Sequence, residues 1–196
     1  MKQIMLLAAT LVLFGDLNAQ DACSNWRWDV KNLTDESGID WDNVTPVSTS
    51  LSQLMYNSDM AFEPAEMTEK QAKKSRMSSE KDLVAITCYV YDVKTDYKNG
   101  EYHLFLSAKK DGSGQQMDAK IPNTDCKGLR RFARLRSVYD KARKEAEIIK
   151  SWTDDGYVVK VELKGVPFRN FEYESRDNVY GMREIHPVTY LKAHLK

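Results

Sequence analysis

Alternating apolar and polar positions recur in the second half of the chain, and this period of two predicts β-strands. In residues 101–108, for example, Leu104 and Leu106 share one face of the predicted strand, while His103 and Phe105 share the other. One longer stretch repeats apolar residues at spacings of three and four, which predicts an amphipathic helix. The predicted strands are 83–93, 101–108, 117–121, 157–165 and 183–191, and the predicted helix is 128–152.

Three strands, one helix and two further strands form the element order of an OB-fold, a small five-stranded barrel. We therefore predict a mainly β, α+β domain over residues 81–196, built as an OB-fold-like barrel. Many unrelated functions share this architecture, so the fold class alone does not define an activity. The side chains expected to fill one closed interior include Tyr102, Leu104, Val159, Val161 and Leu163.

Residues 20–80 are predicted to form an N-terminal extension and connector that pack on the barrel. Alternation in residues 26–31 predicts a short strand, residues 46–51 are expected to be extended, and a short helix is expected to begin at Leu51. Residues 57–80 read as a charged connector. Packing is expected because the extension holds more tryptophan than solvent exposure would tolerate. These tryptophans are Trp26, Trp28 and Trp41.

The first residues have the pattern of a secretory signal peptide. Lys2 supplies a positive charge, and residues 4–14 are almost entirely apolar but too few to cross a bilayer as a helix. We expect residues 1–19 to be removed after Ala19, no transmembrane segment elsewhere, and a periplasmic or extracellular protein. Lipid attachment at Cys23 is the alternative, but the residues before it fit a lipidation site poorly.

Three cysteines in an exported chain allow one disulfide and leave one thiol. Cys88 alternates with apolar residues in the first predicted strand, so we expect it to be buried. We favour a disulfide between Cys23 and Cys126, because it closes the longer loop, of 103 residues. Loop-closure entropy then stabilises the fold by up to about 4–5 kcal/mol. Pairing of Cys88 with Cys126 remains the alternative.

Lysine plus arginine and aspartate plus glutamate each number 29, so the formal net charge is zero. A general polyanion-binding protein would normally have a basic surplus, so nucleic acid is not the expected partner. Only the outer face of the predicted helix could form a local basic patch for phosphates or anionic lipids. The alternative is a solvated helix face with ion pairs between successive turns. The residues of this patch are Arg130, Arg131, Arg134 and Lys141.

Several short segments together resemble an uncharacterised family of exported bacterial OB-fold-like proteins. The resemblance covers most of residues 26–191 and implies the same barrel, export and a single domain, but no activity. The family often has histidine in the connector before its last strand, whereas residues 171–178 here contain none. The segments that carry the resemblance are Trp28-Asp29-Val30-Lys31-Asn32-Leu33-Thr34-Asp35, Glu101-Tyr102-His103-Leu104, Lys120-Ile121-Pro122 leading to Cys126, Lys164-Gly165-Val166-Pro167-Phe168 and Glu184-Ile185-His186-Pro187-Val188.

Two predicted strands each carry a glutamate and a histidine on the same face. These pairs are Glu101 with His103 and Glu184 with His186. If the two faces converge, the four side chains could hold a divalent metal. With Arg183 they could then form a metal-assisted phosphodiester hydrolase. The alternative is that each imidazole bonds a carbonyl or a carboxylate and holds one end of the barrel together.

Aromatic side chains on the first two barrel strands offer a binding surface of another kind. Tyr89, Tyr91 and Phe105 could share one sheet face and stack on bases or sugar rings. The interpretation we favour at this point is that the tryptophan-containing extension covers them.

The sequence as a whole favours a monomeric, non-enzymatic binding or structural module with no cofactor and an unknown ligand. It contains no nucleophile motif, phosphate loop or complete metal-site spacing. The alternatives are the metal-assisted hydrolase and binding of nucleic acid or an anionic surface through the basic helix.

Overall fold

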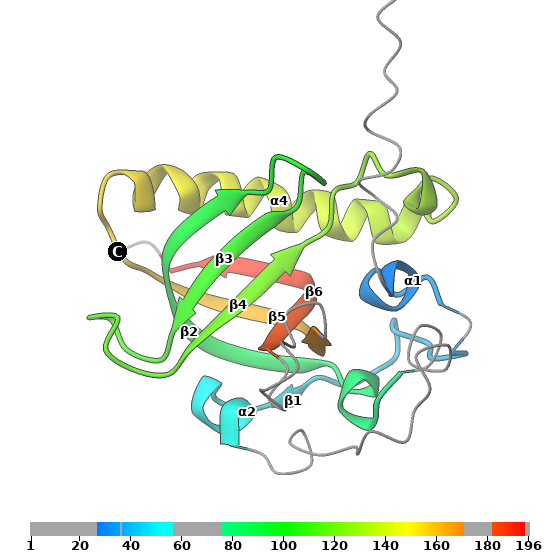
Figure 1. The fold of residues 1–196 in the computed structure, drawn as a ribbon, viewed down its shortest axis with the longest axis horizontal. Helices are drawn as coiled ribbons and strands as arrows, with labels where there is room; N and C mark the ends of the chain where they lie inside the picture. Colours follow the sequence, from blue (N-terminus) through cyan, green and yellow to red (C-terminus); the bar gives the residue numbers. More distant parts are fainter. Residues whose placement is uncertain (1–26, 36, 57–75, 171–181, 195–196) are drawn as a thin grey trace, which may run out of the picture.

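The computed structural model of the chain describes residues 27–35, 37–56, 76–170 and 182–194. Its main body is a closed barrel of five strands with one long helix, and a sixth, short strand pairs outside the barrel (Figure 1). The strands are β1 (Val47–Ser48), β2 (Val84–Thr95), β3 (Tyr102–Ser107), β4 (Gln116–Ile121), β5 (Val159–Asn170) and β6 (Met182–Ala193); the helices are α1 (Trp28–Lys31), α2 (Leu51–Tyr56) and α4 (Ala133–Asp154), with 3₁₀ turns η2 (Ser78–Lys81) and η3 (Lys127–Leu129).

The strand order around the barrel is β2-β3-β4-β6-β5, and β5 pairs back onto β2 to close it. All neighbours are antiparallel except β4 and β6, which run parallel. The first three barrel strands precede α4 in the chain and the last two follow it. The predicted OB-fold-like barrel, with its order of three strands, helix and two strands, is therefore confirmed.

One closed interior holds the inward-facing residues of both halves of the barrel. Leu104 on β3 and Val161 and Leu163 on β5 are each 0% exposed, and Val159 is 4% exposed. Tyr102 is partly buried against the same core. The alternation seen in the sequence therefore assigned the inner face of these strands correctly.

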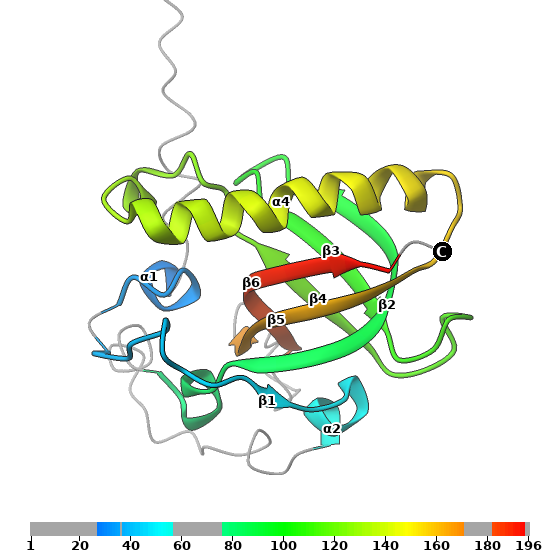
Figure 2. The same cartoon turned by 180° about the vertical axis from the view of Figure 1, so that it is seen from behind.

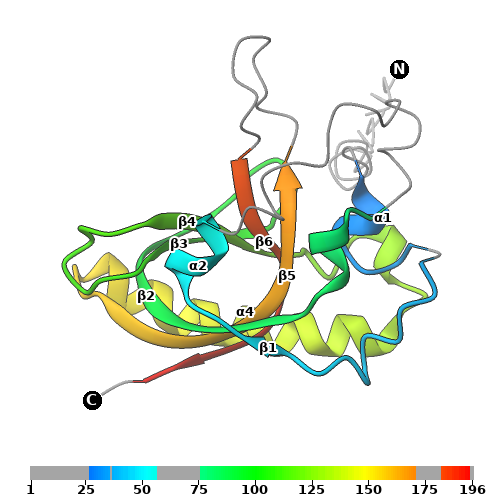
Figure 3. The same cartoon turned by 90° about the horizontal axis from the view of Figure 1, so that it is seen from below.

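Helices α4 and α2 lie at opposite ends of the barrel (Figures 1 and 2). Seen from below, α2 lies in front of the barrel and α4 behind it (Figure 3). Both helices contribute to one core, α2 through Leu51 and Leu54 and α4 through Tyr139, Ala146 and Ile149. The apolar stripe predicted for the long helix is thus the surface that covers one barrel end.

The N-terminal extension is fastened to the barrel by buried polar groups. The hydroxyl of Tyr139 on α4 donates to the carbonyl of Asn32, 3.0 Å away. This bond joins the turn after α1 to a helix residue 107 positions away in the chain. Within the extension itself, Arg76 donates to the carbonyl of Val30 at 2.8 Å and pairs with Asp35. The extension is therefore packed on the barrel, as expected.

The strand predicted over residues 26–31 is wrong, because the described part of this segment is the helix α1. Arg27 has a left-handed backbone (φ 58°), which turns the chain before the helix. Trp28, Val30 and Lys31 are all buried, so contacts on two sides of the segment override its alternation.

Two other element boundaries differ by five residues from those predicted. Strand β5 continues past Gly165 to Asn170, because register shifts around Gly165 and Pro167 accommodate the proline. The long helix begins at Ala133 instead of residue 128, since residues 127–129 form the separate turn η3. None of the helices in the described ranges is long and apolar enough to cross a membrane.

Candidate binding surface and polar cluster on the barrel

Five polar side chains from three neighbouring strands gather on the outer side of the barrel wall, and we call them the polar cluster. Residues 101–103 supply two of them at the start of β3, and β4 and β6 supply the rest. Strand pairing explains their meeting, because His103 lies opposite Lys120 in the register, and Asp118 lies opposite Glu184. The members of the polar cluster are Glu101, His103, Lys120, Glu184 and His186.

His186 is the centre of the polar cluster and is fully buried. Its Nε2 lies 3.5 Å from Oε1 of Glu101, and its Nδ1 lies 3.3 Å from Oε1 of Glu184. The imidazole therefore lies between two carboxylates that belong to different strands. Within the described residues, the contact of Nδ1 with Glu184 has hydrogen-bond geometry, whereas Nε2 of His186 and Oε1 of Glu101 are buried without a hydrogen-bond partner.

The second oxygen of each carboxylate also has a donor. Oε2 of Glu184 lies 2.6 Å from the Lys120 ammonium, and Oε2 of Glu101 accepts from the Asn99 amide at 2.9 Å. Burial alone would raise the pKa of Glu184, but the hydrogen bonds and charges of His186 and Lys120 lower it to about 2. Glu184 is thus held as a buried carboxylate by two cationic or donating neighbours.

His103 lies at the more exposed edge of the polar cluster, with 23% of its side chain exposed. Its Nε2 is 3.9 Å from Glu101 and 4.0 Å from Asp96. Burial and the charge of Lys120 lower the pKa of His103 in spite of the nearby carboxylates. Burial and the Glu184 charge raise the pKa of Asp118 on the adjacent strand.

On one side, the polar cluster is covered by the Phe168 ring of β5 and by two cationic side chains of the N-terminal extension. The Phe168 ring packs edge-on to His186, with centroids 6.0 Å apart. Arg27 lies over the same ring at 4.8 Å, and Lys31 at 5.4 Å. Arg27 also pairs with the buried Glu80. The extension therefore forms part of the wall around this cluster.

The four predicted metal-ligand candidates do come together. Their carboxylate oxygens, however, lie against the histidine ring nitrogens. Within the described residues, no group of three or more His, Cys, Asp or Glu side chains has the geometry of a metal site. Arg183 lies apart from the carboxylates, because its guanidinium donates to the carbonyls of Leu54 and Met55 at the end of α2. The arrangement favours a structural ion network over a cleft for a reacting phosphodiester.

A pair of aromatic rings lies farther along the outer face of β2 and β3. Tyr91 and Phe105 have centroids 6.1 Å apart at a tilt of 49°, and both are only partly buried. Lys94 lies over Phe105 at 5.1 Å and pairs with Asp92 at 3.0 Å. Burial and the carboxylates of Asp118 and Asp92 raise the pKa of Tyr91, so its phenol remains a hydrogen-bond donor. We call Tyr91 and Phe105, together with the adjacent charged residues Asp92, Lys94 and Asp118, the aromatic face.

The expectation that the tryptophan-containing extension covers the aromatic face does not hold for the described tryptophans. The Trp28 indole lies against Gly128, and Trp41 lies against Arg76. Trp26 lies outside the described residues. Tyr89 lies opposite Ser107 and Lys160 in the barrel and lines a separate pocket.

The predicted basic patch lies on and just before α4. Arg134 pairs with Asp42 of the extension, Arg131 stacks on Phe132, and Arg130 and Lys141 are exposed. Part of this basic surface therefore serves to fasten the extension.

Of the three cysteines, Cys88 is a free, buried thiol, which excludes the alternative pairing of Cys88 with Cys126. Burial raises the pKa of the Cys88 thiol to about 12. Cys126 is buried, and Cys23, like the predicted signal peptide and residues 171–178, lies outside the described residues. The Cys23–Cys126 disulfide remains a prediction.

Reasoning from the sequence missed Lys120, Asp92, Lys94 and Asp118 as site residues. Lys120 alternates with the buried Ala119 and Ile121, so the pattern places it on the outer face. The sequence pattern gives no reason to place β4 beside β6, because that pairing follows only from the closed topology.

No family model and no curated protein matches this chain. One solved structure with some likeness is described as a "putative aspartyl-tRNA synthetase" from Leishmania major Friedlin, with 11% sequence identity and a TM-score of 0.35. The match covers 81% of this chain and 22% of that one, so this chain spans about a fifth of that protein's length. At this TM-score the likeness supports no inference about activity.

Proposed function

We propose that the protein is an exported, non-enzymatic binding module that recognises oligosaccharides on its aromatic face. The observation that carries the proposal is the partly exposed pair of rings, Tyr91 and Phe105, with carboxylates at its edge. OB barrels bind oligonucleotides and oligosaccharides on the outer surface of their second and third strands, which here are β3 and β4. Phe105 lies on β3, directly opposite Asp118 on β4.

The charges around the aromatic face favour a sugar over a nucleic acid. Asp92 and Asp118 would repel phosphates, whereas carboxylates accept hydrogen bonds from sugar hydroxyls. The chain also has no net positive charge to attract a polyanion. The Lys94 ammonium over Phe105 belongs to a side chain that is 67% exposed, so a sugar ring can displace it at little cost.

The non-enzymatic part of the proposal rests on how the polar cluster is used. The Glu184 carboxylate has one oxygen on His186 and the other on Lys120, and the Glu101 carboxylate has one oxygen on Asn99 and the other 3.5 Å from His186. A metal or a substrate would have to displace these buried contacts. We infer that the polar cluster stabilises the seam between β4 and β6, because buried polar networks make a packed region rigid.

Export and membership of the family that the chain resembles are part of the same proposal. The pattern of Lys2 and residues 4–14 supports a cleaved signal peptide, and the segment from Trp28 to Asp35 supports the family. N-terminal sequencing of the protein recovered outside the cytoplasm should begin near Gln20. A mature protein that begins at Met1, or that carries lipid on Cys23, would contradict this part.

The binding proposal is tested with two uncharged probes, an N-acetylglucosamine hexamer and a β-1,3-glucan hexamer, by titration calorimetry. We expect at least one probe to bind, and Tyr91→Ala and Phe105→Ala each to weaken it about tenfold or more. Tyr97→Ala is the matched control, because Tyr97 is 90% exposed in the turn after β2. Binding of oligo-dT in preference to both sugars, or an equal loss in the Tyr97 variant, would contradict the proposal.

A further inference from the structure

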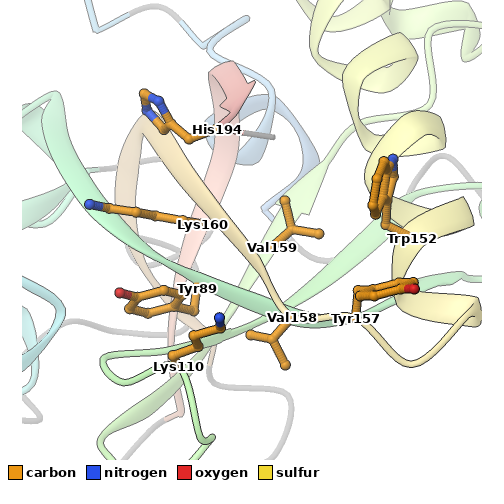
Figure 4. Close-up of a pocket in the computed structure, with 8 residues that line it drawn as sticks. All are labelled: Tyr89, Lys110, Trp152, Tyr157, Val158, Val159, Lys160 and His194. Carbon is orange, nitrogen blue, oxygen red and sulfur yellow. The ribbon is translucent and has the colours of Figure 1, made fainter. Parts of the chain in front are cut away.

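An open pocket of about 460 Å³ lies where α4 ends and β5 begins (Figure 4), and its lining includes no residue of the aromatic face or the polar cluster. Its volume lies within the range of small-molecule sites in proteins. Val158 and Val159 at the start of β5 lie between two groups of side chains (Figure 4). One group is aromatic, Trp152 and Tyr157, and the other is mainly basic, Lys110, Lys160 and His194, together with Tyr89.

The backbone of the aromatic wall is fixed by the end of the helix. Gly156 has a left-handed backbone (φ 84°) and donates to the Thr153 carbonyl at 3.0 Å, while the amide of Tyr157 donates to the carbonyl of Trp152 at 3.0 Å. These two bonds form a Schellman motif. In this motif the second residue after the helix cap, here Tyr157, contacts the third residue before the cap, here Trp152. The Trp152 and Tyr157 rings meet edge to face with centroids 5.4 Å apart. They nevertheless remain 37% and 57% exposed.

The opposite side of the pocket collects positive charge from three separate elements. Lys110 comes from the turn between β3 and β4, Lys160 from β5, and His194 from the residue after β6. The amide of His194 donates to the Lys160 carbonyl at 2.8 Å, which fixes the end of β6 beside β5. No carboxylate lines the pocket among the described residues. The basic side chains therefore face a site with no local counter-charge.

An aromatic wall opposite a basic side fits a ligand with two parts. A nucleobase, or the apolar face of a sugar ring, can stack on either Trp152 or Tyr157, because stacking on aromatic side chains accepts many ring types. A phosphate can bind Lys110 and Lys160, which present donors and positive charge, with the His194 ring N–H as a further donor. We propose that this pocket binds a small phosphorylated ring compound, either a nucleoside monophosphate or a sugar phosphate. The proposal rests on residues that the proposed function does not use, so either can fail alone.

The test measures binding to the whole mature protein at low salt, with uridine monophosphate, glucose 6-phosphate, uridine and inorganic phosphate as probes. The readout is the indole N–H resonance of Trp152, assigned with Trp152→Phe. We expect a phosphorylated ring compound to shift this resonance and to bind at least tenfold more tightly than inorganic phosphate or uridine. Binding of only the nucleotide or only the sugar phosphate identifies the source of the ring.

Charge-reversal variants locate the phosphate. Lys110→Glu and Lys160→Glu should each weaken binding about tenfold or more, because both residues are exposed and their replacement leaves the core intact. Lys109→Glu is the matched control: it makes the same change one residue away, outside the pocket lining. The proposal is overturned if neither phosphorylated compound binds at millimolar concentration, if uridine binds as tightly as its phosphate, or if Lys109→Glu weakens binding as much as Lys110→Glu.

Discussion

The ammonium of Lys120 on β4 lies 2.6 Å from the carboxylate of Glu184 on β6, with both side chains almost fully buried. These two strands form the one parallel pairing in the barrel, and it is short, with two residue pairs in register. A buried, hydrogen-bonded ion pair thus lies where backbone pairing is weakest. The Lys120–Glu184 ion pair therefore holds β4 and β6 together, and we call it the clamp.

Breaking the clamp on one side should destabilise the protein strongly. Lys120→Met leaves the Glu184 carboxylate buried without its nearest cation, and such losses cost about 3–5 kcal/mol. Urea unfolding followed by circular dichroism measures the change. Lys144→Met, which removes an exposed lysine from α4, should change the free energy of unfolding by less than about 0.5 kcal/mol. Equal stability of the Lys120 variant and the parent would mean that the clamp has no role in folding.

The same carboxylate predicts how stability depends on pH. The pKa of Glu184 falls from an ordinary value of 4.5 to about 2 in the folded protein. Because the folded pKa is the lower one, its contribution is fully present above pH 4.5 and is lost as the pH falls from 4.5 to 2. The loss amounts to about 3 kcal/mol. The lowered pKa of His103 acts in the same direction, beginning below its ordinary value of 6.5, and the raised pKa of Asp118 opposes it.

Glu184→Gln isolates this contribution. Its free energy of unfolding, measured in urea at pH 7, 5, 4 and 3, should fall less steeply below pH 4.5 than that of the parent protein. Parallel pH profiles for the two proteins would assign the acid sensitivity to other carboxylates.

The hydroxyl of Tyr139 predicts how firmly the extension is held. Tyr139→Phe leaves the Asn32 carbonyl buried without this donor and should cost about 1–3 kcal/mol. Tyr157→Phe is the matched control, since Tyr157 is 57% exposed. Limited proteolysis should cut the Tyr139 variant in the extension faster than the parent. If both variants behave alike, the extension is held by its other contacts.

The thiols are expected to differ in reactivity. In protein isolated from an oxidising compartment, peptide mapping without reduction should find Cys23 and Cys126 in one cross-linked peptide. Cys88 should react with iodoacetamide only after unfolding, because it is 1% exposed and its pKa is raised to about 12. Alkylation of Cys126 in the folded, unreduced protein would contradict the predicted disulfide.

The barrel could be predicted from the sequence because the patterns that specify its strands and its helix each lie within a short stretch of the chain. Alternation assigned Leu104, Val161 and Leu163 to the interior, and spacing assigned Tyr139, Ala146 and Ile149 to the buried face of the helix. The structure confirms both assignments.

The contacts of the extension could not be predicted, because they join residues far apart in the chain. Arg27 and Glu80 are 53 positions apart and both buried, and no periodicity indicates such a pair. The helix α1 was missed for a related reason: Trp28, Val30 and Lys31 are buried on more than one side, so their alternation resembled that of a strand. The polar cluster lies between these cases. The sequence indicated its glutamates and histidines, but only closure of the barrel brings Lys120 to Glu184.

The most direct test of the account maps where an oligosaccharide contacts the protein. Backbone amide resonances are recorded while the N-acetylglucosamine hexamer or the β-1,3-glucan hexamer is added. Binding on the aromatic face predicts that the largest shifts fall on Tyr91, Lys94, Phe105 and Asp118. Saturating titrations that shift none of these amides, or that shift only residues of α4 and its pocket, would contradict it.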